Sequence, residues 1–367
     1  MKEFVQLEID LGDDQRPAAS ASPVKVASLY PRFRFMGSKY QLLPWMHQVL
    51  SGLEFESALD AFSGSGCVAY LLKAMGKRVI ANDFLQFAFH IANGLVANPG
   101  LPLTESHVEM LTADNPAAEH FIENTFRGVF FTVDDLRFLD NVWSNLASLP
   151  DDWRRSLALT ALFRAALKRQ PRGVFTVSSS QARKYDDGRR DLRMSLRQHF
   201  LESVRVLNRL VYDNGKRNQA ICGDVFEVDL DPPPDLVYFD PPYVPRRDDN
   251  DYIKRYHFLE GLACYWRGVE IIESTKVKKI RKKFTPFSYR STALEAFDRL
   301  FAKFADSMLV LSYSSNAYPD KDYLIKLMKR YKRRVYIEEK THRYHFGTHS
   351  SVSAERVVVR EYLIIGE

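Results

Sequence analysis

Four consecutive residues, Asp240-Pro241-Pro242-Tyr243, carry groups that could orient an amine for reaction. An amine attached to an aromatic ring is a weak nucleophile, because its lone pair is delocalised into the ring. The Asp240 carboxylate can accept one amine hydrogen and the Pro241 carbonyl another, which directs the lone pair of the nitrogen at an electrophile. The prolines restrict the backbone, and Tyr243 offers a face on which a flat ring can stack. The alternative is a plain turn that ends a strand.

A glycine-rich turn is the second candidate for chemistry. Ser63-Gly64-Ser65-Gly66 follows the short apolar segment 58–62, and glycine lets a ligand approach the backbone closely. Asp83 ends the next apolar segment, where its carboxylate would accept hydrogen bonds from ribose hydroxyls. The turn also fits a loose dinucleotide-binding pattern, so a nicotinamide cofactor is one alternative. A tight turn with no ligand is another.

The elements around these motifs predict a mostly parallel sheet of the Rossmann-like α/β class. A strand at 58–62, a helix through residue 74 and a strand at 77–83 form a βαβ unit, which implies parallel strands. Other predicted elements are a helix at 40–50, strands at 220–224, 235–240 and 307–313, a helix at 320–331, and a final antiparallel strand pair at 335–339 and 356–365. Both motifs would then meet at the carboxyl edge of the sheet, where such folds bind ligands.

The helical periods of residues 132–149 and 153–168 interrupt this strand pattern. We expect a mainly helical insertion at 96–215 within an α/β core made of residues 24–95 and 216–367. Residues 1–23 are rich in Asp and then in Pro, Ala and Ser, which is typical of a flexible leader.

Composition narrows the class of protein. The chain has 367 residues, of which 46% are hydrophobic and 27% charged, as in ordinary globular proteins. No apolar run approaches the roughly 20 residues of a membrane span. Cys67, Cys222 and Cys264 lie far apart, so they suggest neither a disulfide framework nor a metal site and suit a reducing cytoplasm. The net charge of +6 is compatible with a polyanionic partner but is weak evidence alone.

Three basic groups are candidate phosphate contacts: Lys168, Arg169 and Arg172; Arg246 and Arg247; and Lys278, Lys279 and Lys282. Such cations give salt-dependent binding to nucleic acid without reading its sequence. The alternative for each group is a solvated face. The aromatic runs 256–258 and 344–346 are expected to pack rather than to bind a ligand.

Four segments, in this order, resemble the Dam-like class of DNA adenine methyltransferases. They are Phe35–Tyr40, Asp60–Gly66, Asn82-Asp83 and Asp240–Tyr243. The resemblance implies a Rossmann-like methyltransferase core in which Asp240, Pro241 and Tyr243 are catalytic. It also implies that an adenine is flipped out of double-stranded DNA to reach them.

The same resemblance implies S-adenosylmethionine as the methyl donor. Its implied contacts are Met36, Gly37, Lys39, Tyr40, Asp60, Phe62, Gly64, Ser65, Gly66, Asp83, Asp224, Val225, Phe226 and Asp240, with Asp224 to Phe226 beside the adenine of the donor. The insertion 96–215 occupies the place of the family's target-recognition part, and a cognate restriction endonuclease is a candidate partner.

Other functions remain open on chemistry alone. The tetrad would also suit the exocyclic amine of cytosine or an RNA substrate, and only the order of the segments favours adenine in DNA. A nicotinamide-dependent oxidoreductase would explain neither the tetrad nor the Lys39 segment. A non-catalytic DNA-binding subunit would have no use for an intact Asp240 and Tyr243.

Overall fold

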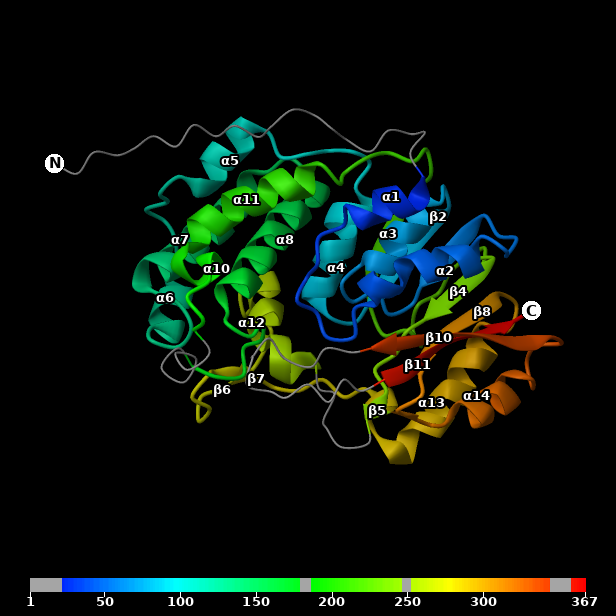
Figure 1. Cartoon of the computed structure of the whole chain (residues 1–367). Coiled ribbons are helices and arrows are strands. Elements are labelled where there is room, and N and C mark those ends of the chain that lie inside the picture. Colours follow the sequence, from blue (N-terminus) through cyan, green and yellow to red (C-terminus); the bar gives the residue numbers. More distant parts are fainter. Residues whose placement is uncertain (1–21, 179–185, 246–251, 344–357) are drawn as a thin grey trace.

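A seven-stranded sheet forms the centre of the computed structural model, in the order β10-β11-β8-β4-β1-β2-β3 (Figure 1). Its strands are β1 Ser57–Asp60, β2 Arg78–Asp83, β3 Gln219–Cys222, β4 Leu236–Phe239, β8 Met308–Ser314, β10 Val335–Arg343 and β11 Val358–Gly366. Strands β3, β2, β1, β4 and β8 run parallel, and β11 pairs antiparallel with both β8 and β10. The predicted α/β sheet with its C-terminal antiparallel pair is confirmed.

The structure describes residues 22–178, 186–245, 252–343 and 358–367. Most of the expected leader, Arg246, Arg247 and the aromatic run 344–346 lie outside the described residues. The first described helix, α1 Pro23–Ser28, begins at the last residue of that leader. No helix within the described ranges combines the length and the apolar character that a membrane span requires.

Helices cover both faces of the sheet. The side chains of β4 point alternately into two hydrophobic clusters, one on each face. Leu236 and Tyr238 join one cluster, and Val237 and Phe239 join the other, as the two-residue period of a strand requires. The first cluster includes helices α1, α2 Leu43–Leu50, α3 Cys67–Ala74 and α4 Gln86–Ala92, and η1 Lys39–Leu42 lies before α2. The second includes α13 Arg290–Lys303, preceded by η5 Pro286–Ser288, and α14 Lys321–Met328.

A helical region lies beside the sheet (Figure 1). After the π-helical turn η2 Asn93–Ala97, it contains α5 Glu105–Thr112, α6 Phe121–Phe126, α7 Val133–Asn145, η3 Leu146–Ser148, α8 Asp152–Arg169, α10 Arg190–Arg193 and α11 Leu196–Asn208. Side-chain caps define where its long helices begin: Thr132 caps α7, Asp151 caps α8, and Ser195 caps α11. Each cap satisfies a backbone N–H that the first turn leaves without a partner.

One more helix, α12 Tyr252–Cys264, packs in this helical region although it follows the tetrad in the chain. The ring of its Phe258 contacts Phe126, Phe130 and Phe175, with centroids 5.0 to 5.4 Å apart. Two short strand pairs flank this part of the chain: β5 Val244–Pro245 with β9 Ala317–Tyr318, and β6 Ile271–Ile272 with β7 Lys279–Ile280. After the tetrad and β5, the next described element of the chain is thus α12, in the helical region.

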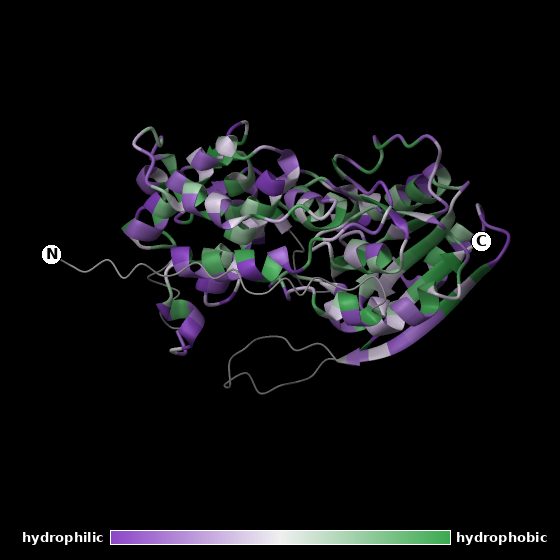
Figure 2. Ribbon diagram, turned by 90° about the horizontal axis from the view of Figure 1, so that it is seen from above, coloured by the Kyte–Doolittle hydropathy of each residue, from purple (hydrophilic) through white to green (hydrophobic). Residues whose placement is uncertain are grey.

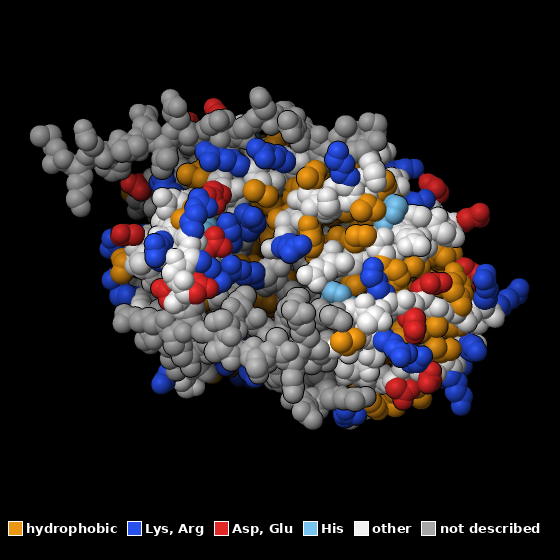
Figure 3. Space-filling view, viewed as in Figure 1, with side chains coloured by type: hydrophobic (Ala, Val, Ile, Leu, Met, Phe, Trp, Pro, Cys, Tyr) orange, Lys and Arg blue, Asp and Glu red, His pale blue; other side chains and the backbone are white. Residues whose placement is uncertain are grey.

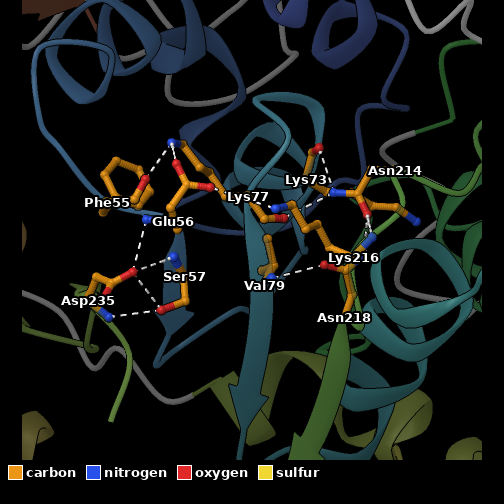
Figure 4. Close-up of polar contacts among 10 residues, drawn as sticks. All are labelled: Phe55, Glu56, Ser57, Lys73, Lys77, Val79, Asn214, Lys216, Asn218 and Asp235. Atoms are coloured by element: carbon orange, nitrogen blue, oxygen red, sulfur yellow. Dashed lines mark hydrogen bonds and ion pairs between the residues drawn. The ribbon is translucent and has the colours of Figure 1, made fainter. Parts of the chain in front are cut away.

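Polar side chains fasten the amino ends of the strands (Figure 4). The Asp235 carboxylate accepts hydrogen bonds from the backbone N–H groups of Glu56 and Ser57, at 2.9 and 2.8 Å. The backbone N–H of Val79 donates to Asn218 at 2.9 Å. These contacts align β1 with β4 and β2 with β3, so the opposite, carboxyl edge presents its loops in a fixed arrangement.

The outer strand β10 is largely hydrophilic, in contrast to the apolar strands inside the sheet (Figure 2). Its sequence, VYIEEKTHR, carries two acids and two cations in the middle and at the end. Charges on an edge strand disfavour pairing with another chain, so we expect the sheet to end at β10.

Candidate active site

One cavity lies at the carboxyl ends of β1, β2 and β4, where both sequence motifs meet. Its walls are the segment 35–39, the turn 60–65 with Cys67 and Val68, the loop 83–85, the residues Tyr238, Asp240 and Pro242 at the end of β4, and Tyr252 of α12. Parallel strands bring their carboxyl ends to one edge, which explains why residues as distant in the chain as Asp83 and Asp240, at the ends of β2 and β4, converge here.

The glycine turn depends on backbone conformations that favour glycine. Gly64 has a φ of 48° and Gly66 a φ of 74°, in the left-handed region that side chains disfavour. A Cβ atom at Gly66 would lie 2.7 Å from the Tyr30 hydroxyl, which itself donates to the Ser65 carbonyl at 2.6 Å. The turn is therefore held on its outer side and open to the cavity on the other.

Asp83 fastens this turn from the end of β2. One carboxylate oxygen accepts the backbone N–H of Gly64 at 2.8 Å, and the other accepts that of Leu85 at 2.9 Å. Burial raises the pKa of Asp83 to about 6, although these two hydrogen bonds lower it. Each carboxylate oxygen can accept more than one hydrogen bond, so the bonds to the turn are compatible with ribose contacts.

The tetrad carboxylate is paired with a buried lysine. Lys39 Nζ lies 2.8 Å from Asp240 Oδ1 and donates to the Gly37 carbonyl at 3.2 Å. The Lys39 side chain is 4% exposed and that of Asp240 19%. Burial raises the pKa of Asp240, and the charge and hydrogen bond of Lys39 lower it. The lysine thus favours the ionised form of the acid that would hold an amine.

Three acids gather in this cavity against one cation. Asp60, Asp83 and Asp240 all line it, and Lys39 is the one Lys or Arg among its described lining residues. Burial raises the pKa of Asp60 to about 8, and the nearby charges of Asp240 and Asp83 contribute to that rise. Acids confined in a buried site raise one another's pKa values, and a cationic ligand relieves this repulsion whereas an anion increases it. This electrostatic environment suits a sulfonium and would repel the pyrophosphate of a nicotinamide cofactor.

Two buried polar atoms of the turn lack a hydrogen-bond partner among the described residues. Among the described residues, neither Asp60 Oδ1 nor Ser63 Oγ has a hydrogen-bond partner, and both residues line the cavity. Buried polar atoms in folded proteins are nearly always hydrogen-bonded. The cavity therefore fits a ligand with polar hydrogens, such as the amino acid part of a methyl donor.

Tyr243 stands beside the Lys39–Asp240 pair. Burial raises its pKa, with a smaller lowering by Lys39, and its ring meets that of Tyr313 edge-on with centroids 5.8 Å apart. The short ladder between β5 and β9 fixes the backbone directly after Tyr243. The backbone ladder and the contact with Tyr313 thereby hold its ring in place.

The structure brings most of the predicted donor contacts together, but not all. The residues that line the one cavity are Met36, Gly37, Lys39, Asp60, Phe62, Gly64, Ser65, Asp83 and Asp240. Gly66 lies behind them, at the start of α3, and Tyr40 directs its hydroxyl to the Ser28 carbonyl instead.

The segment 224–226 also lies beyond the lining of the cavity. Asp224 is exposed and accepts the Phe226 N–H at 3.0 Å, Val225 is buried in the core, and the Phe226 ring stacks on Phe287. A contact between these residues and the adenine of the donor therefore stays a prediction.

Several residues that line the cavity are not among the predicted donor contacts. Burial raises the pKa of Tyr252 strongly, and Asp240 and Lys39 both lie near enough to affect it. Phe35, Phe84 and Tyr238 also line the cavity. Tyr238 could have been found from the strand period, because it alternates with Val237 and Phe239. Nothing local in the sequence points Tyr252 at the site.

The predicted phosphate contacts lie in varied surroundings. Lys168 pairs with Asp191 and Glu202 at 3.6 and 3.4 Å, and Arg169 with Asp135 at 3.7 Å. Arg172 is exposed. Lys278 pairs with Glu273, Lys279 is half-buried, and Lys282 lies over the Tyr289 ring at 5.2 Å. Figure 3 shows the same mixture of basic and acidic side chains over the helical half of the molecule.

The fold and the cavity define a methyltransferase of the α/β class. Residues 35–305 match the family model of the D12 class N6 adenine-specific DNA methyltransferases, and the chain belongs to this family. It is an adenine-specific DNA methyltransferase, as predicted from the resemblance. Its substrate is therefore DNA, and its methyl donor is of the S-adenosylmethionine type.

The relatives are enzymes of the same kind. The chain is 29% identical over 327 residues to the Type II methyltransferase M2.HphI of Haemophilus parahaemolyticus, an alignment that covers 86% of this chain and 92% of that one. It is 23% identical over 355 residues to the modification methylase LlaI of Lactococcus lactis subsp. lactis, covering 90% and 54%. The modification methylase StsI of Streptococcus sanguinis is 24% identical over 331 residues, covering 81% and 46%.

Proposed function

We propose that the cavity binds S-adenosylmethionine and that Asp240, Pro241 and Tyr243 present the N6 amine of a flipped adenine to it. The observation that carries this proposal is the gathering of Asp60, Asp83 and Asp240 in one cavity, where the single cation among the described lining residues is already paired. When bound, the donor supplies an electrophilic methyl group on a positively charged sulfur.

The donor would lie between the turn and the segment 36–39. Asp60 and Ser63 would accept or donate hydrogen bonds to its amino acid part, because both carry buried polar atoms that lack a partner among the described residues. The Asp83 carboxylate would accept hydrogen bonds from the ribose hydroxyls of the donor while it also accepts the Gly64 N–H of the turn. Gly64, which lines the cavity, places no side chain between the turn and the donor.

Asp240 and Pro241 would orient the amine. Lys39 donates to Oδ1 of Asp240, so Oδ2 would accept an amine hydrogen. The Pro241 carbonyl would accept the other hydrogen, and the nitrogen lone pair would point at the methyl carbon. Asp240 need not be a strong base, because the amine becomes acidic only as it gains the methyl group. Much of the rate would come from this positioning.

Tyr243 would stack on the flipped base. A base inside a duplex cannot reach the cavity and must leave the helix, and an aromatic face compensates for part of the lost stacking. The helical region at 96–215, which lies beside the sheet together with α12, would contact the target sequence. We further propose that the modification protects DNA from a cognate endonuclease, because relatives are modification methylases.

The test is methyl transfer from labelled S-adenosylmethionine to duplex DNA, followed by digestion to nucleosides. We expect label in N6-methyladenine with the native protein. The Asp240→Ala variant should lose about 10²- to 10³-fold or more of the rate, as when an oriented catalytic group is removed elsewhere, and should keep its circular dichroism spectrum. Label in N4-methylcytosine, or full activity of Asp240→Ala, would contradict the proposal.

A further inference from the structure

Tyr256 of α12 holds the backbone of the segment that carries Lys39. Its hydroxyl accepts the backbone N–H of Met36 at 2.8 Å and donates to the Arg34 carbonyl at 3.1 Å. Its ring is parallel to that of Phe35, with centroids 5.1 Å apart. Tyr256 is 1% exposed and does not line the cavity, so it acts on the cavity wall through the main chain.

The helix α12 is deformed at this residue. Tyr256 has a φ of −119° and a ψ of 17°, outside the helical range. Kinks in helices have local causes, and no proline lies in α12. The kink coincides with the two hydrogen bonds of the Tyr256 hydroxyl, which tie the helix to the N-terminal segment.

One turn further along, Glu260 holds the opposite wall. It is fully buried, accepts the backbone N–H of Phe87 at 3.2 Å and pairs with Lys283 at 3.0 Å. Lys283 also donates to the Phe84 carbonyl at 3.2 Å. Phe84 and Leu85 line the cavity, so Glu260 fixes this loop from outside in the way that Tyr256 fixes the other segment.

The same helix fastens the loop that follows α8 and carries Arg172 and Phe175, called the basic loop below. His257 contacts the Phe175 carbonyl through Nε2 at 2.8 Å, and the Phe175 N–H donates to the Arg255 carbonyl at 2.9 Å. Burial lowers the pKa of His257 to about 4, so the neutral ring donates this hydrogen bond at physiological pH. Tyr256, His257 and Glu260 of α12 thus hold three different segments.

We propose that α12 is the element through which the helical region sets the shape of the methyl-donor pocket, with Tyr256 and Glu260 as its positioning residues. This inference rests on the proposed function, in which the cavity binds S-adenosylmethionine. It assigns to these two side chains a role in the donor affinity, although neither lines the cavity.

The first test compares two tyrosines that each lose only a hydroxyl. In Tyr256→Phe, the Met36 N–H and the Arg34 carbonyl lose this partner and the segment 36–39 loosens. The matched control is Tyr70→Phe, because Tyr70 is also buried and donates to the Leu210 carbonyl at 2.8 Å without lining the cavity. Isothermal titration with S-adenosylmethionine gives the Kd of the native protein and of both variants.

We expect Tyr256→Phe to weaken donor binding about 3- to 10-fold, the range for one or two net hydrogen bonds, and to raise the KM for the donor by a similar factor. The Kd for duplex DNA in the absence of donor should stay within about twofold, because His257 still holds the basic loop. Both variants should lose some thermal stability, because each removes a buried hydroxyl that donates a hydrogen bond. Equal donor Kd values for Tyr256→Phe and Tyr70→Phe would overturn the inference.

Glu260→Gln tests the other wall. Glutamine keeps an acceptor for the Phe87 N–H and removes the ion pair with Lys283, so the loop 83–85 should lose its outer anchor. We expect donor binding to weaken about 3- to 10-fold again, and an unchanged donor Kd would overturn the assignment of Glu260. A native protein that fails to bind S-adenosylmethionine at all would instead contradict the proposed function, so the two failures are distinguishable.

Discussion

Lys39 Nζ lies 2.8 Å from Asp240 Oδ1, although the two residues are 201 positions apart in the chain. The pair joins the segment in front of the first strand to the tetrad at the end of β4. Lysine is seldom fully buried without a partner, and here the partner is the acid that would bind the amine. The charge state of the site therefore depends on both residues.

Replacing Lys39 by Met should shift the pH dependence of the reaction. Burial raises the pKa of Asp240 and Lys39 opposes that rise, so removing the lysine raises the pKa of Asp240 further. The ionised acid is then lost at a higher pH as the pH falls. We expect the acidic limb of the kcat/KM profile to move toward neutral pH in Lys39→Met. Lys39→Arg, which keeps the charge, should move it less, and an unmoved limb in Lys39→Met would argue against the pairing.

Asp60 should make the ligand-free protein less stable as the pH rises. Burial, with Asp240 and Asp83, raises its folded pKa to about 8 from an ordinary value of 3.8. The folded state therefore binds more protons than the unfolded state between about pH 4 and pH 8, and stability falls across this window as the pH rises. The Asp60→Asn variant has no titratable group at this position, so it should not lose stability in this way as the pH rises.

The difference in Tm between Asp60→Asn and the native protein should thus grow from pH 5 to pH 8. Differential scanning calorimetry without donor measures it, and Asp235→Asn is a contrasting variant, because hydrogen bonds lower the pKa of Asp235. A difference that stays constant with pH would mean that Asp60 keeps an ordinary pKa.

Tyr243 should support base flipping through its ring rather than its hydroxyl. Tyr243→Phe keeps the aromatic face, whereas Tyr243→Ala removes a stacking contact worth about 1–3 kcal/mol. With 2-aminopurine at the target position, we expect a fluorescence rise for the native protein and Tyr243→Phe, and a much smaller one for Tyr243→Ala. Equal signals from all three proteins would place the base elsewhere.

The basic run after β6 should contribute to the salt dependence of DNA binding. Changing Lys278, Lys279 and Lys282 to Gln should flatten the slope of log K against log salt by about 0.9 for each phosphate that the variant no longer neutralises. Lys278 already pairs with Glu273, so its share should be the smallest. The matched control changes Lys321, Lys326 and Lys329, on or next to α14, and should leave the slope unchanged. A native slope in the first variant would assign that run to a solvated face.

The sequence predicted those parts of the site that depend on local patterns. Short apolar runs, the glycine turn and the acid at the end of β2 each have a signal within a few residues, so the parallel sheet and the meeting of both motifs at its edge could be predicted. The pairing of Lys39 with Asp240 could not, because it depends on how distant segments pack. The same holds for the acids that pair with Lys168.

The helix α12 could not be predicted from the sequence, for a physical reason. Residues 256–263 are all buried, so the helix lacks the polar face that produces a helical period in the sequence. The rings of Tyr256, His257 and Phe258 pack, as expected, but two of the three side chains also hold backbone groups of other segments. The side chains of Tyr256 and His257 therefore both pack in the core and position other segments.

The place of β11 between β8 and β10 has a consequence for synthesis of the chain. β8 and β10 are made first, and they are separated in the sheet until Val358–Gly366 enters between them. Until then β8, the neighbour of the tetrad strand, is an open edge, and open edges pair with other chains. We expect the nascent chain to expose this edge until β11 has been made and β8 becomes an inner strand of the sheet.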